Sequence, residues 1–356
     1  MRMTVLASGS KGNSTVIASG RTRVLVDAGL SCRELLRRMA LAGEDPAELS
    51  AILVTHEHID HVAGLAVLAR RLRIPVFFTE PTHRAWVRML TPRTTMSYAQ
   101  WLDHMQHEKE ARAAATAAAH ASSPPPVDLA ACSSPRSEDI RSEGIRAEDI
   151  RSEALRSEDP HATLELPVDE DCDEPLALGT SAKEKANPAH LPAVEYFRAG
   201  KNFSIGDLQI TPFTIPHDAA DPCGFVFAAE GIRMAVATDL GYMPPNVKAA
   251  LQRIDVLLLE SNHDLEMLRD GPYPWSVKQR VLSRVGHLSN AATAEFLQND
   301  YDGGAHTIIL GHLSESNNAP ELARLAAEEA LTRHPTLLGN RVLLAHQAAP
   351  LEPVCL

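Results

Sequence analysis

Short runs of apolar residues, separated by polar and glycine-containing segments, make up roughly the first ninety residues of this 356-residue chain. The runs are rich in Val, Leu and Ile and too short for helices, which predicts strands over 3–7, 15–18, 23–26, 52–54 and 74–79. Apolar residues at helical spacing predict helices over 31–42, 62–73 and 82–90. Ser31 and Glu34 have the spacing of a capping box, and Gly43 is placed to end the first helix.

The same pattern resumes near Val194. Residues 203–213 predict a hairpin that turns at 206–207, and a second strand pair, 225–229 with 233–237, turns at 230–231. Further strands are predicted at 255–259, 307–310 and 341–345, and helices at 247–251, 275–284, from Ser289 onward, and at 320–332. Ser289 is suited to cap its helix.

The segment between these two parts has a different composition. It contains an alanine run at 113–119, a proline run at 124–126, and a five-residue repeat whose copies begin at positions 136, 141, 146, 151 and 156. Such a sequence cannot bury enough apolar surface to offset the entropy of ordering it. We therefore expect one domain built from residues 1–94 and 194–356, with 95–193 as a largely disordered insertion. Its histidines, at 104, 107, 120, 161 and 190, are not expected to hold a metal.

Four side chains typical of metal ligands follow the strand predicted at 52–54: His56, His58, Asp60 and His61, in the pattern His-x-His-x-Asp-His. Imidazole and carboxylate together favour zinc, manganese or iron over calcium. The chain has 16 histidines, but a chance match to so specific a pattern is improbable. The motif therefore predicts a metal site at a strand end.

Three further candidates, His217, Asp239 and His312, also follow predicted strands. Each alone has a simpler reading as a cap or loop residue. If the strands lie in sheets of common orientation, however, all seven side chains meet at one rim. Seven such ligands suit two metals that activate a water and stabilise an in-line phosphoryl displacement. We predict that His56, His58 and His217 hold one metal, that Asp60, His61 and His312 hold the other, and that Asp239 bridges them.

Other polar residues lie near these strand ends. His287 precedes a predicted helix and is either a proton donor to the leaving oxygen or a surface histidine. Four residues are candidates for positioning the ligands or His287: Asp27, Glu260, Asn262 and His263. The loop after the first strand offers Ser8, Ser10, Lys11 and Asn13, which suit either phosphate binding or a polar hairpin turn.

Charge and cysteine content set limits on these interpretations. The net charge is −12, but residues 101–195 hold 20 acidic and 9 basic residues, so the remainder is nearly neutral and neither supports nor excludes an anionic substrate. The five cysteines are scattered without a Cys-x-x-Cys pair, which fits a reducing compartment. No signal-peptide pattern and no apolar run of membrane-spanning length is present, so we expect a cytoplasmic protein without membrane association.

The ordered set of Asp27, the His56–His61 motif, His217, Asp239 and His312 resembles the metallo-β-lactamase superfamily. Several longer segments resemble its WalJ (YycJ)-type branch: 6–14, 27–31, 216–222, 237–242, 259–264, 286–290 and 311–314. The resemblance covers roughly 1–94 and 194–350. It implies an α/β fold, a four-layer αββα sandwich with a two-metal site, and 5′→3′ exonuclease activity on DNA.

The expected function is therefore a metal-dependent phosphodiesterase that acts on DNA, with Asp60, Asp239 and His287 as catalytic residues and zinc or manganese, or alternatively iron, as the two divalent ions. The acidic insertion is a candidate site for a protein partner. Two alternatives stay open: a hydrolase of a thioester, lactone or cyclic phosphodiester, and a metal-binding regulatory module without turnover. The sequence has no conspicuous basic stripe, so the choice of DNA depends on the resemblance.

Overall fold

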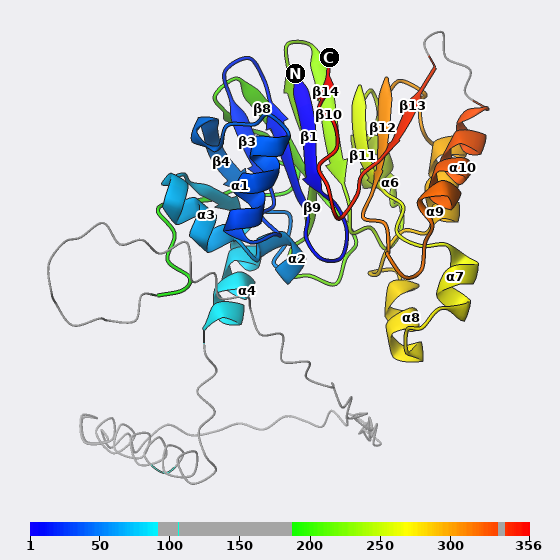
Figure 1. Ribbon diagram of the computed structural model, residues 1–356, viewed down its shortest axis with the longest axis horizontal. Helices are drawn as coiled ribbons and strands as arrows, with labels where there is room; N and C mark the ends of the chain where they lie inside the picture. The colour runs from blue at the N-terminus through cyan, green and yellow to red at the C-terminus, as the bar shows by residue number, and fades with distance from the viewer. Residues whose placement is uncertain (92–105, 107–186, 334–338) are drawn as a thin grey trace, which may run out of the picture. The chain divides into compact units, whose positions relative to one another are not determined.

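A computed structural model describes residues 1–91, 106, 187–333 and 339–356 of the protein (Figure 1). Residue contacts divide the chain into Met1–Thr91 with Pro167–Leu356, and Pro92–Leu166. Everything below concerns the first of these units. The predicted insertion falls almost wholly outside the described residues, with its repeats and with the histidines at 104, 107, 120 and 161. Leu191, which the sequence assigns to the insertion, is buried in the core.

The first sheet has seven strands in the order β14-β1-β2-β3-β4-β5-β6. The strands are β1 (Arg2–Ala7), β2 (Ser14–Ala18), β3 (Arg23–Val26), β4 (Leu49–Leu53), β5 (Val76–Phe78), β6 (Val194–Tyr196) and β14 (Val354–Cys355). Strands β1, β2 and β3 pair antiparallel, and β3 to β6 pair parallel. Strand β14 brings the end of the chain beside its start, with Arg2 opposite Cys355 (Figure 1).

The second sheet also has seven strands, in the order β13-β12-β11-β10-β9-β8-β7. The strands are β7 (Phe203–Ile205), β8 (Leu208–Thr214), β9 (Cys223–Ala229), β10 (Ile232–Ala237), β11 (Val256–Glu260), β12 (Thr307–Gly311) and β13 (Arg341–Leu344). Strands β7 to β10 form antiparallel hairpins, and β10 to β13 are parallel. The predicted hairpins and their turns are confirmed.

Helices cover the outer faces of the two sheets and one end of the sandwich. They are α1 (Cys32–Leu41), α2 (Ile59–Val62), α3 (Leu65–Leu72), α4 (Glu80–Leu90), α6 (Pro245–Ala250), α7 (Leu265–Asp270), α8 (Trp275–Val281), α9 (Asn290–Asn299) and α10 (Pro320–Leu331), with a short 3₁₀ helix at Pro46–Glu48. Ser31 caps α1 and Ser289 caps α9, each accepting a hydrogen bond from a backbone N–H three residues later, as the sequence predicts.

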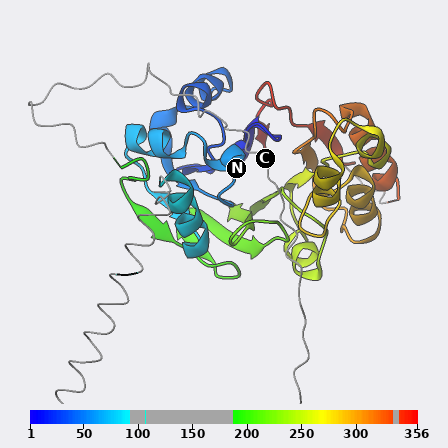
Figure 2. The ribbon, with the colours of Figure 1, turned by 90° about the horizontal axis from the view of Figure 1, so that it is seen from below.

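Three apolar clusters fill the spaces between these layers. One lies between the sheets and includes Val5, Phe225 and Leu258. A second packs α1, α3 and α4 on the first sheet, and a third packs α6, α9 and α10 on the second. Figure 2 shows the two sets of helices on opposite sides of the molecule. The predicted αββα sandwich is thus confirmed.

The structure departs from the predicted elements in four places. The helix predicted over 62–73 is interrupted between α2 and α3, because the N–H of Gly64 donates to the carbonyl of Ala28 at 2.9 Å instead of to a carbonyl of α2. Helix α7 was not predicted, since it buries only Leu268 and so lacks an apolar period. Strands β6 and β14 are too short to show a pattern.

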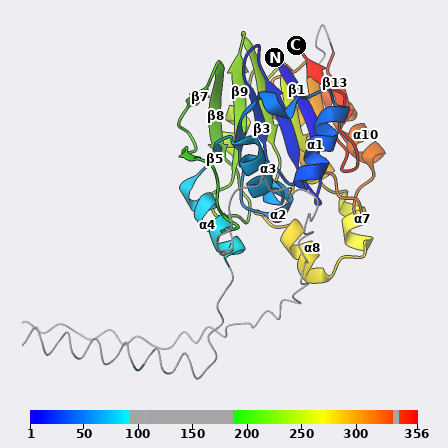
Figure 3. The ribbon, with the colours of Figure 1, turned by 60° about the vertical axis from the view of Figure 1, so that its left-hand side comes forward.

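Parallel pairing of β3 with β4, and of β10 with β11 and β12, gives each sheet a set of strands that end at the same edge. Helices α2, α7 and α8 lie at this end of the sandwich in Figures 1 and 3. The segments that follow β4, β8, β10 and β12 carry the predicted metal ligands. In the part of the chain that the structure describes, no helix is long and apolar enough to span a bilayer.

Candidate metal centre

The segment between β4 and α2 supplies the first group of ligands. The Nε2 of His56 lies 3.1 Å from Nδ1 of His58, and the Nε2 of His217, which follows β8, lies 3.2 Å from the same Nδ1. One ligand atom from each of the three lies within 4.8 Å of the others. His56 is fully buried and His217 nearly so. The first predicted set of three ligands is therefore brought together.

A second group meets beside it. One ligand atom from each of Asp60, His61 and His312 lies within 4.8 Å of the others. Oδ2 of Asp60 lies 3.6 Å from Nε2 of His61 and 3.7 Å from Nε2 of His312. Asp60 and His61 belong to α2, whereas His312 directly follows β12 of the other sheet. This group therefore joins the two halves of the sandwich.

Asp239 lies between the two groups. Its Oδ2 is 3.4 Å from Nε2 of His61, and its Oδ1 is 3.6 Å from Nε2 of His312 and 3.9 Å from Nε2 of His217. Within the described residues, Oδ2 of Asp239 and Nε2 of His312 form no hydrogen bond although both are buried. Buried polar atoms without partners are rare and costly. A cation between the groups would satisfy both atoms.

Backbone strain is concentrated at this rim. Asp27, Asp239 and His312 follow β3, β10 and β12, and their φ values are 61°, 63° and 54°. L-residues rarely adopt positive φ, and such conformations persist only where the surroundings enforce them. The chain thus turns sharply at three strand ends, and each turn places a charged or metal-binding side chain at the same site.

Hydrogen bonds fix the orientation of two histidine rings. Oδ2 of Asp27 accepts a hydrogen bond from Nδ1 of His61 at 2.8 Å, which leaves Nε2 of that ring facing Asp60 and Asp239. Thr55 donates its N–H and its hydroxyl to Asp27, and its hydroxyl also lies 3.0 Å from Nδ1 of His56. Carboxylates that hold the second nitrogen of a ligand histidine are common in metal sites. Asp27 therefore has the positioning contacts that the sequence predicts.

Glu260, the last residue of β11, connects two further histidines. Its Oε1 accepts from Nδ1 of His287 at 2.8 Å and from Nδ1 of His312 at 2.9 Å. Burial alone would raise the pKa of Glu260, but the charges and hydrogen bonds of the two histidines outweigh it and lower that pKa to about 2. Glu260 is therefore an anion that holds both rings, and His287 remains one-fifth exposed at the rim.

The electrostatics of the cluster favour bound positive charge. Burial opposes protonation of His61, yet the carboxylates of Asp239, Asp27 and Asp60 raise its pKa to about 9. Burial raises the pKa of Asp239, but the surrounding histidines hold it well below its usual range. These residues attract a cation, and imidazole and carboxylate are the ligands that divalent transition metals prefer. The residues present thus fit a divalent metal.

The glycine-containing loop between β1 and β2 lies against this cluster. Ser8 is buried, and its hydroxyl accepts a hydrogen bond from the backbone N–H of His312 at 2.8 Å. Nδ2 of Asn13 lies 3.3 Å from Oδ2 of Asp60 and 3.1 Å from Nε2 of His61. Ser10 and Lys11 are exposed, and Nζ of Lys11 pairs with Glu315. The four residues predicted to bind phosphate therefore divide into two that contact the ligands and two that face solvent.

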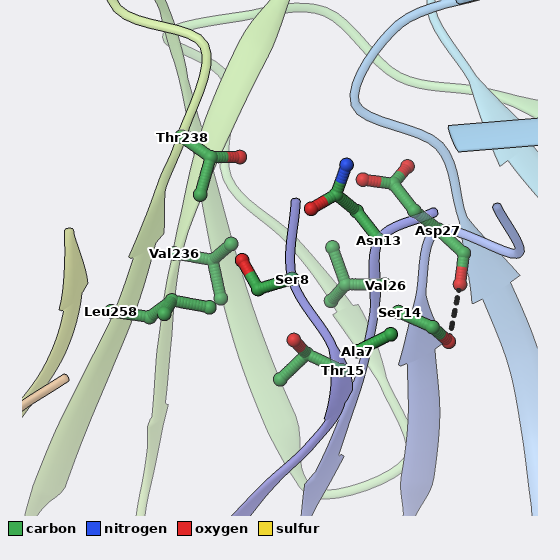
Figure 4. Close-up of a pocket in the computed structure, with 10 residues that line it drawn as sticks. All are labelled: Ala7, Ser8, Asn13, Ser14, Thr15, Val26, Asp27, Val236, Thr238 and Leu258. Atoms are coloured by element: carbon green, nitrogen blue, oxygen red, sulfur yellow. Dashed lines mark hydrogen bonds between the residues drawn. The ribbon is translucent and has the colours of Figure 1, made fainter. Parts of the chain in front are cut away.

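A pocket lined by residues of both sheets borders the centre (Figure 4). Its polar lining is formed by Ser8, Asn13, Ser14, Thr15, Asp27 and Thr238, and its apolar lining by Ala7 of β1, Val26 of β3, Val236 of β10 and Leu258 of β11. In Figure 4, Ser14 donates a hydrogen bond to the carbonyl of Asp27, at 2.9 Å. The pocket is thus enclosed by groups that support the ligands.

The two remaining predicted positioning residues, Asn262 and His263, differ in their contacts. Nδ2 of Asn262 donates to the carbonyl oxygen of His312 at 2.8 Å, and so supports the strained backbone there. His263 is buried, and among the described residues neither of its ring nitrogens has a hydrogen-bond partner. Burial lowers the pKa of His263 to about 4, so its ring is neutral. No contact orients a ligand through this ring.

The sequence did not predict two residues that contact the candidate ligands, Thr55 and Asp218. Thr55 carries no chemical signature apart from its position between a buried strand and His56. Asp218 pairs with Arg280 at 2.6 Å and lies 3.4 Å from Nε2 of His217. The separation of 62 residues between Asp218 and Arg280 hides this pair, although the position of Asp218 beside His217 is a usable signal.

Comparisons with known proteins agree with this geometry. A family model described as the metallo-beta-lactamase superfamily matches residues 7–277. The exodeoxyribonuclease WalJ of Streptococcus pneumoniae serotype 2 (strain D39 / NCTC 7466) is 28% identical over 332 residues, which cover 93% of this chain and 88% of that protein. The exodeoxyribonuclease YycJ of Bacillus anthracis is 28% identical over 331 residues, with 93% and 89% covered.

Solved structures share the fold at lower identity. The metallo-beta-lactamase fold protein YhfI from Bacillus subtilis has 13% identity and a TM-score of 0.53, with 99% of each chain covered. The Zn²⁺-bound PqqB from Methylobacterium extorquens has 15% identity and a TM-score of 0.54, with 99% and 100% covered. Since the family model spans most of the chain and the sandwich is that of the family, this protein belongs to the metallo-β-lactamase superfamily and is a hydrolase of that fold.

Proposed function

We propose that this protein is a metal-dependent DNA exonuclease that uses two divalent ions and releases nucleotides from 5′ ends. One observation carries the proposal: a chain that matches proteins named exodeoxyribonuclease over 93% of its length also gathers seven candidate ligands at one rim. Phosphodiester hydrolysis is a reaction to which paired divalent ions are well suited.

In this proposal the seven ligands form two sets. His56, His58 and His217 would hold one ion, and Asp60, His61 and His312 would hold the other, since the members of each set lie within reach of one another. Asp239 serves both, since its two oxygens face ligands of both groups. When bound, the two ions supply a more acidic water and neutralise charge that develops on the phosphoryl oxygens. Zinc and manganese both suit this ligand set, and iron is an alternative.

The side chains around these ligands have separate tasks. Asp27 and Thr55 fix the rings of His61 and His56, so that their Nε2 atoms face the centre. Glu260 fixes His312 in the same manner. Rings held in place lose little conformational freedom when a metal binds, which supports tight and specific binding.

His287 is the proton donor in this proposal. Its Nδ1 bonds to Glu260, and the side chain is partly exposed at the rim, where a leaving oxygen can approach. The carboxylate sets the orientation of the ring. In the proposed step the oxygen of a water molecule bonds to phosphorus, the phosphorus–oxygen bond to the leaving nucleotide breaks, and His287 gives its proton to the leaving oxygen.

A substrate panel tests the proposal. The purified protein, supplied with manganese or zinc, is given 5′-phosphorylated single-stranded and duplex DNA, matched 5′-hydroxyl strands, RNA of the same sequence and a chromogenic phosphodiester. Release of mononucleotides from 5′-labelled DNA supports the proposal. Nucleotide release from 3′ ends, or a preference for RNA, contradicts the proposed polarity or substrate. Metal binding without turnover contradicts the proposed catalysis.

The second candidate function is hydrolysis of a small thioester, lactone or cyclic phosphodiester. The sequence has no conspicuous basic stripe of the kind that polyanion-binding proteins usually carry, which leaves this alternative open. Turnover of such esters with no release of nucleotides from DNA is the result that would favour this alternative.

A further inference from the structure

Helix α8 and the residues around it form an unusually exposed segment at the rim. The only buried residue of α8 is Lys278, whose Nζ donates to the carbonyl of Arg269 at 2.7 Å. Trp275 is 66% exposed, and Leu282, at 50%, is also largely in solvent. A surface helix normally buries an apolar stripe. Here the apolar side chains face outward, which indicates a surface that meets another molecule.

This segment is joined directly to the metal centre. Arg280 pairs with Asp218, which lies beside the candidate ligand His217. The carbonyl of Val285 accepts a hydrogen bond from the N–H of Asp218 at 3.1 Å. Nδ1 of His217 lies 3.2 Å from the carbonyl of Gly286. In Figures 1 and 3, α8 lies at the same end of the sandwich as α2, which carries Asp60 and His61.

Its exposed charge complements a polyanion. The exposed cations of residues 272–286 are Arg280, which also pairs with Asp218, and Arg284, and this stretch contains no acidic residue. Arg284 lies over the ring of Tyr242, with its Cζ 4.3 Å from the ring centroid, and is exposed. A basic surface beside an exposed aromatic ring is the combination by which proteins hold single-stranded nucleic acid, since the cations contact phosphates and a base stacks on the ring.

We propose that residues 273–285, the α8 platform, bind the single strand of DNA next to the nucleotide being cleaved, with a base stacked on Trp275 and with Arg280 and Arg284 beside the phosphates. This inference rests on the proposed nuclease function and adds the position of the DNA strand on the protein. Trp275 precedes Arg280 by five residues, which is roughly 7.5 Å along the helix axis. A strand held at the metal centre therefore reaches the indole within its first few nucleotides.

The platform assigns the end of a DNA strand as the part that is bound. An exposed indole can stack on an unpaired base or on the open face of a terminal base pair. Stacking tolerates every base, so little sequence preference is expected. Phosphate contacts by Arg280 and Arg284 make binding weaken with salt.

Two variants with a matched control test this proposal. Trp275→Ala removes the indole, and Leu325→Ala removes an equally exposed apolar side chain from α10 on the outer face of the second sheet. Steady-state rates are measured on a long 5′-phosphorylated oligothymidine and on the one-nucleotide ester thymidine 5′-p-nitrophenyl phosphate. For Trp275→Ala, KM for the oligothymidine should rise about tenfold, and the ratio of oligothymidine to ester cleavage should fall by the same factor. Leu325→Ala should leave both rates unchanged.

Salt dependence supplies a second readout. The affinity for oligothymidine is measured by fluorescence anisotropy over a series of salt concentrations. In Arg284→Gln, loss of one phosphate contact should reduce the slope of log affinity against log salt by about 0.7. If Trp275→Ala and Arg284→Gln both match Leu325→Ala on oligothymidine, the platform is overturned while the nuclease function stands.

Two further outcomes separate the alternatives. If the unmodified protein releases no nucleotide from any DNA, the proposed function itself fails. If Trp275→Ala instead halves the mass of the protein in sedimentation, the exposed face is an interface between two copies of the chain, and the platform is overturned.

Discussion

Oδ2 of Asp27 lies 2.8 Å from Nδ1 of His61, and the same carboxylate accepts two hydrogen bonds from Thr55. Asp27 is buried and has a φ of 61°. The strained strand end at β3 therefore places one anion where it holds the ring of a candidate ligand. This contact links the backbone of the first sheet to the candidate metal centre and leads to the first prediction.

Asp27→Asn should weaken metal binding about 10–100-fold, because an amide is a weaker acceptor and no longer favours the tautomer with Nε2 free for metal. Asn tolerates positive φ as Asp does, so the fold should persist. Affinity is measured by competition with a chromogenic chelator. Asp207→Asn, at an exposed hairpin turn, is the control. Equal affinities in the two variants would show that Asp27 does not position His61.

Asp239→Asn should remove metal and activity together. The proposed bridging role uses both oxygens of Asp239, and an amide offers one oxygen and no charge. The φ of 63° again suits Asn, so loss of metal cannot be ascribed to the backbone alone. Bound metal is counted by native mass spectrometry and by elemental analysis of the same sample, with circular dichroism as the folding control. A variant that keeps two ions per chain and wild-type turnover rules out a bridging Asp239.

Much of this centre was predictable because its ligands follow strands. An apolar strand has a clear sequence signature, and parallel strands end at a common edge. His56, Asp239 and His312 were placed together on that ground, and the structure brings them together. The same reasoning predicted the capping residues Ser31 and Ser289, which act within three residues of their partners.

The parts that escaped prediction depend on contacts between distant segments. The break between α2 and α3 arises because the N–H of Gly64 donates to the carbonyl of Ala28, a contact between separate segments that the sequence does not show. The pair Asp218–Arg280 and the hydrogen bond from His312 to Ser8 join residues far apart in the chain. His263 was predicted to position a ligand or His287, yet its ring has no hydrogen-bond partner among the described residues. Motifs identify residue types, whereas packing decides which atoms meet.

His287→Gln should reduce kcat about 10²–10⁴-fold on DNA while bound metal is unchanged, because the proposed role is to protonate a poor leaving group. The nitrophenolate leaving group of thymidine 5′-p-nitrophenyl phosphate needs little protonation, so turnover of that ester should fall far less. His306→Gln, at an exposed position before β12, is the control. A loss of equal size on DNA and on the ester contradicts a proton-donor role and indicates a structural one.

Metal uptake should depend on pH in the range set by His61. The neighbouring carboxylates raise the pKa of His61 to about 9, and a histidine must lose its proton to bind a metal. Affinity should therefore fall about tenfold for each pH unit below 9 for each proton displaced. Calorimetric titrations in two buffers of different ionisation enthalpy give the number of protons released. Affinity that is flat between pH 7 and pH 9 would show that His61 is neutral before metal binds.

The metal-free protein should show the opposite trend in stability. Since the pKa of His61 in the fold lies above its ordinary value of 6.5, its protonated ring stabilises the metal-free fold. That contribution is complete below pH 6.5 and is lost as pH rises through about 9. In the presence of a chelator, the melting temperature by scanning calorimetry should fall between those values, and Asp27→Asn should reduce the fall because it removes one of the carboxylates that raise the pKa. A melting temperature that rises over this range would show that protonation of His61 does not stabilise the metal-free fold.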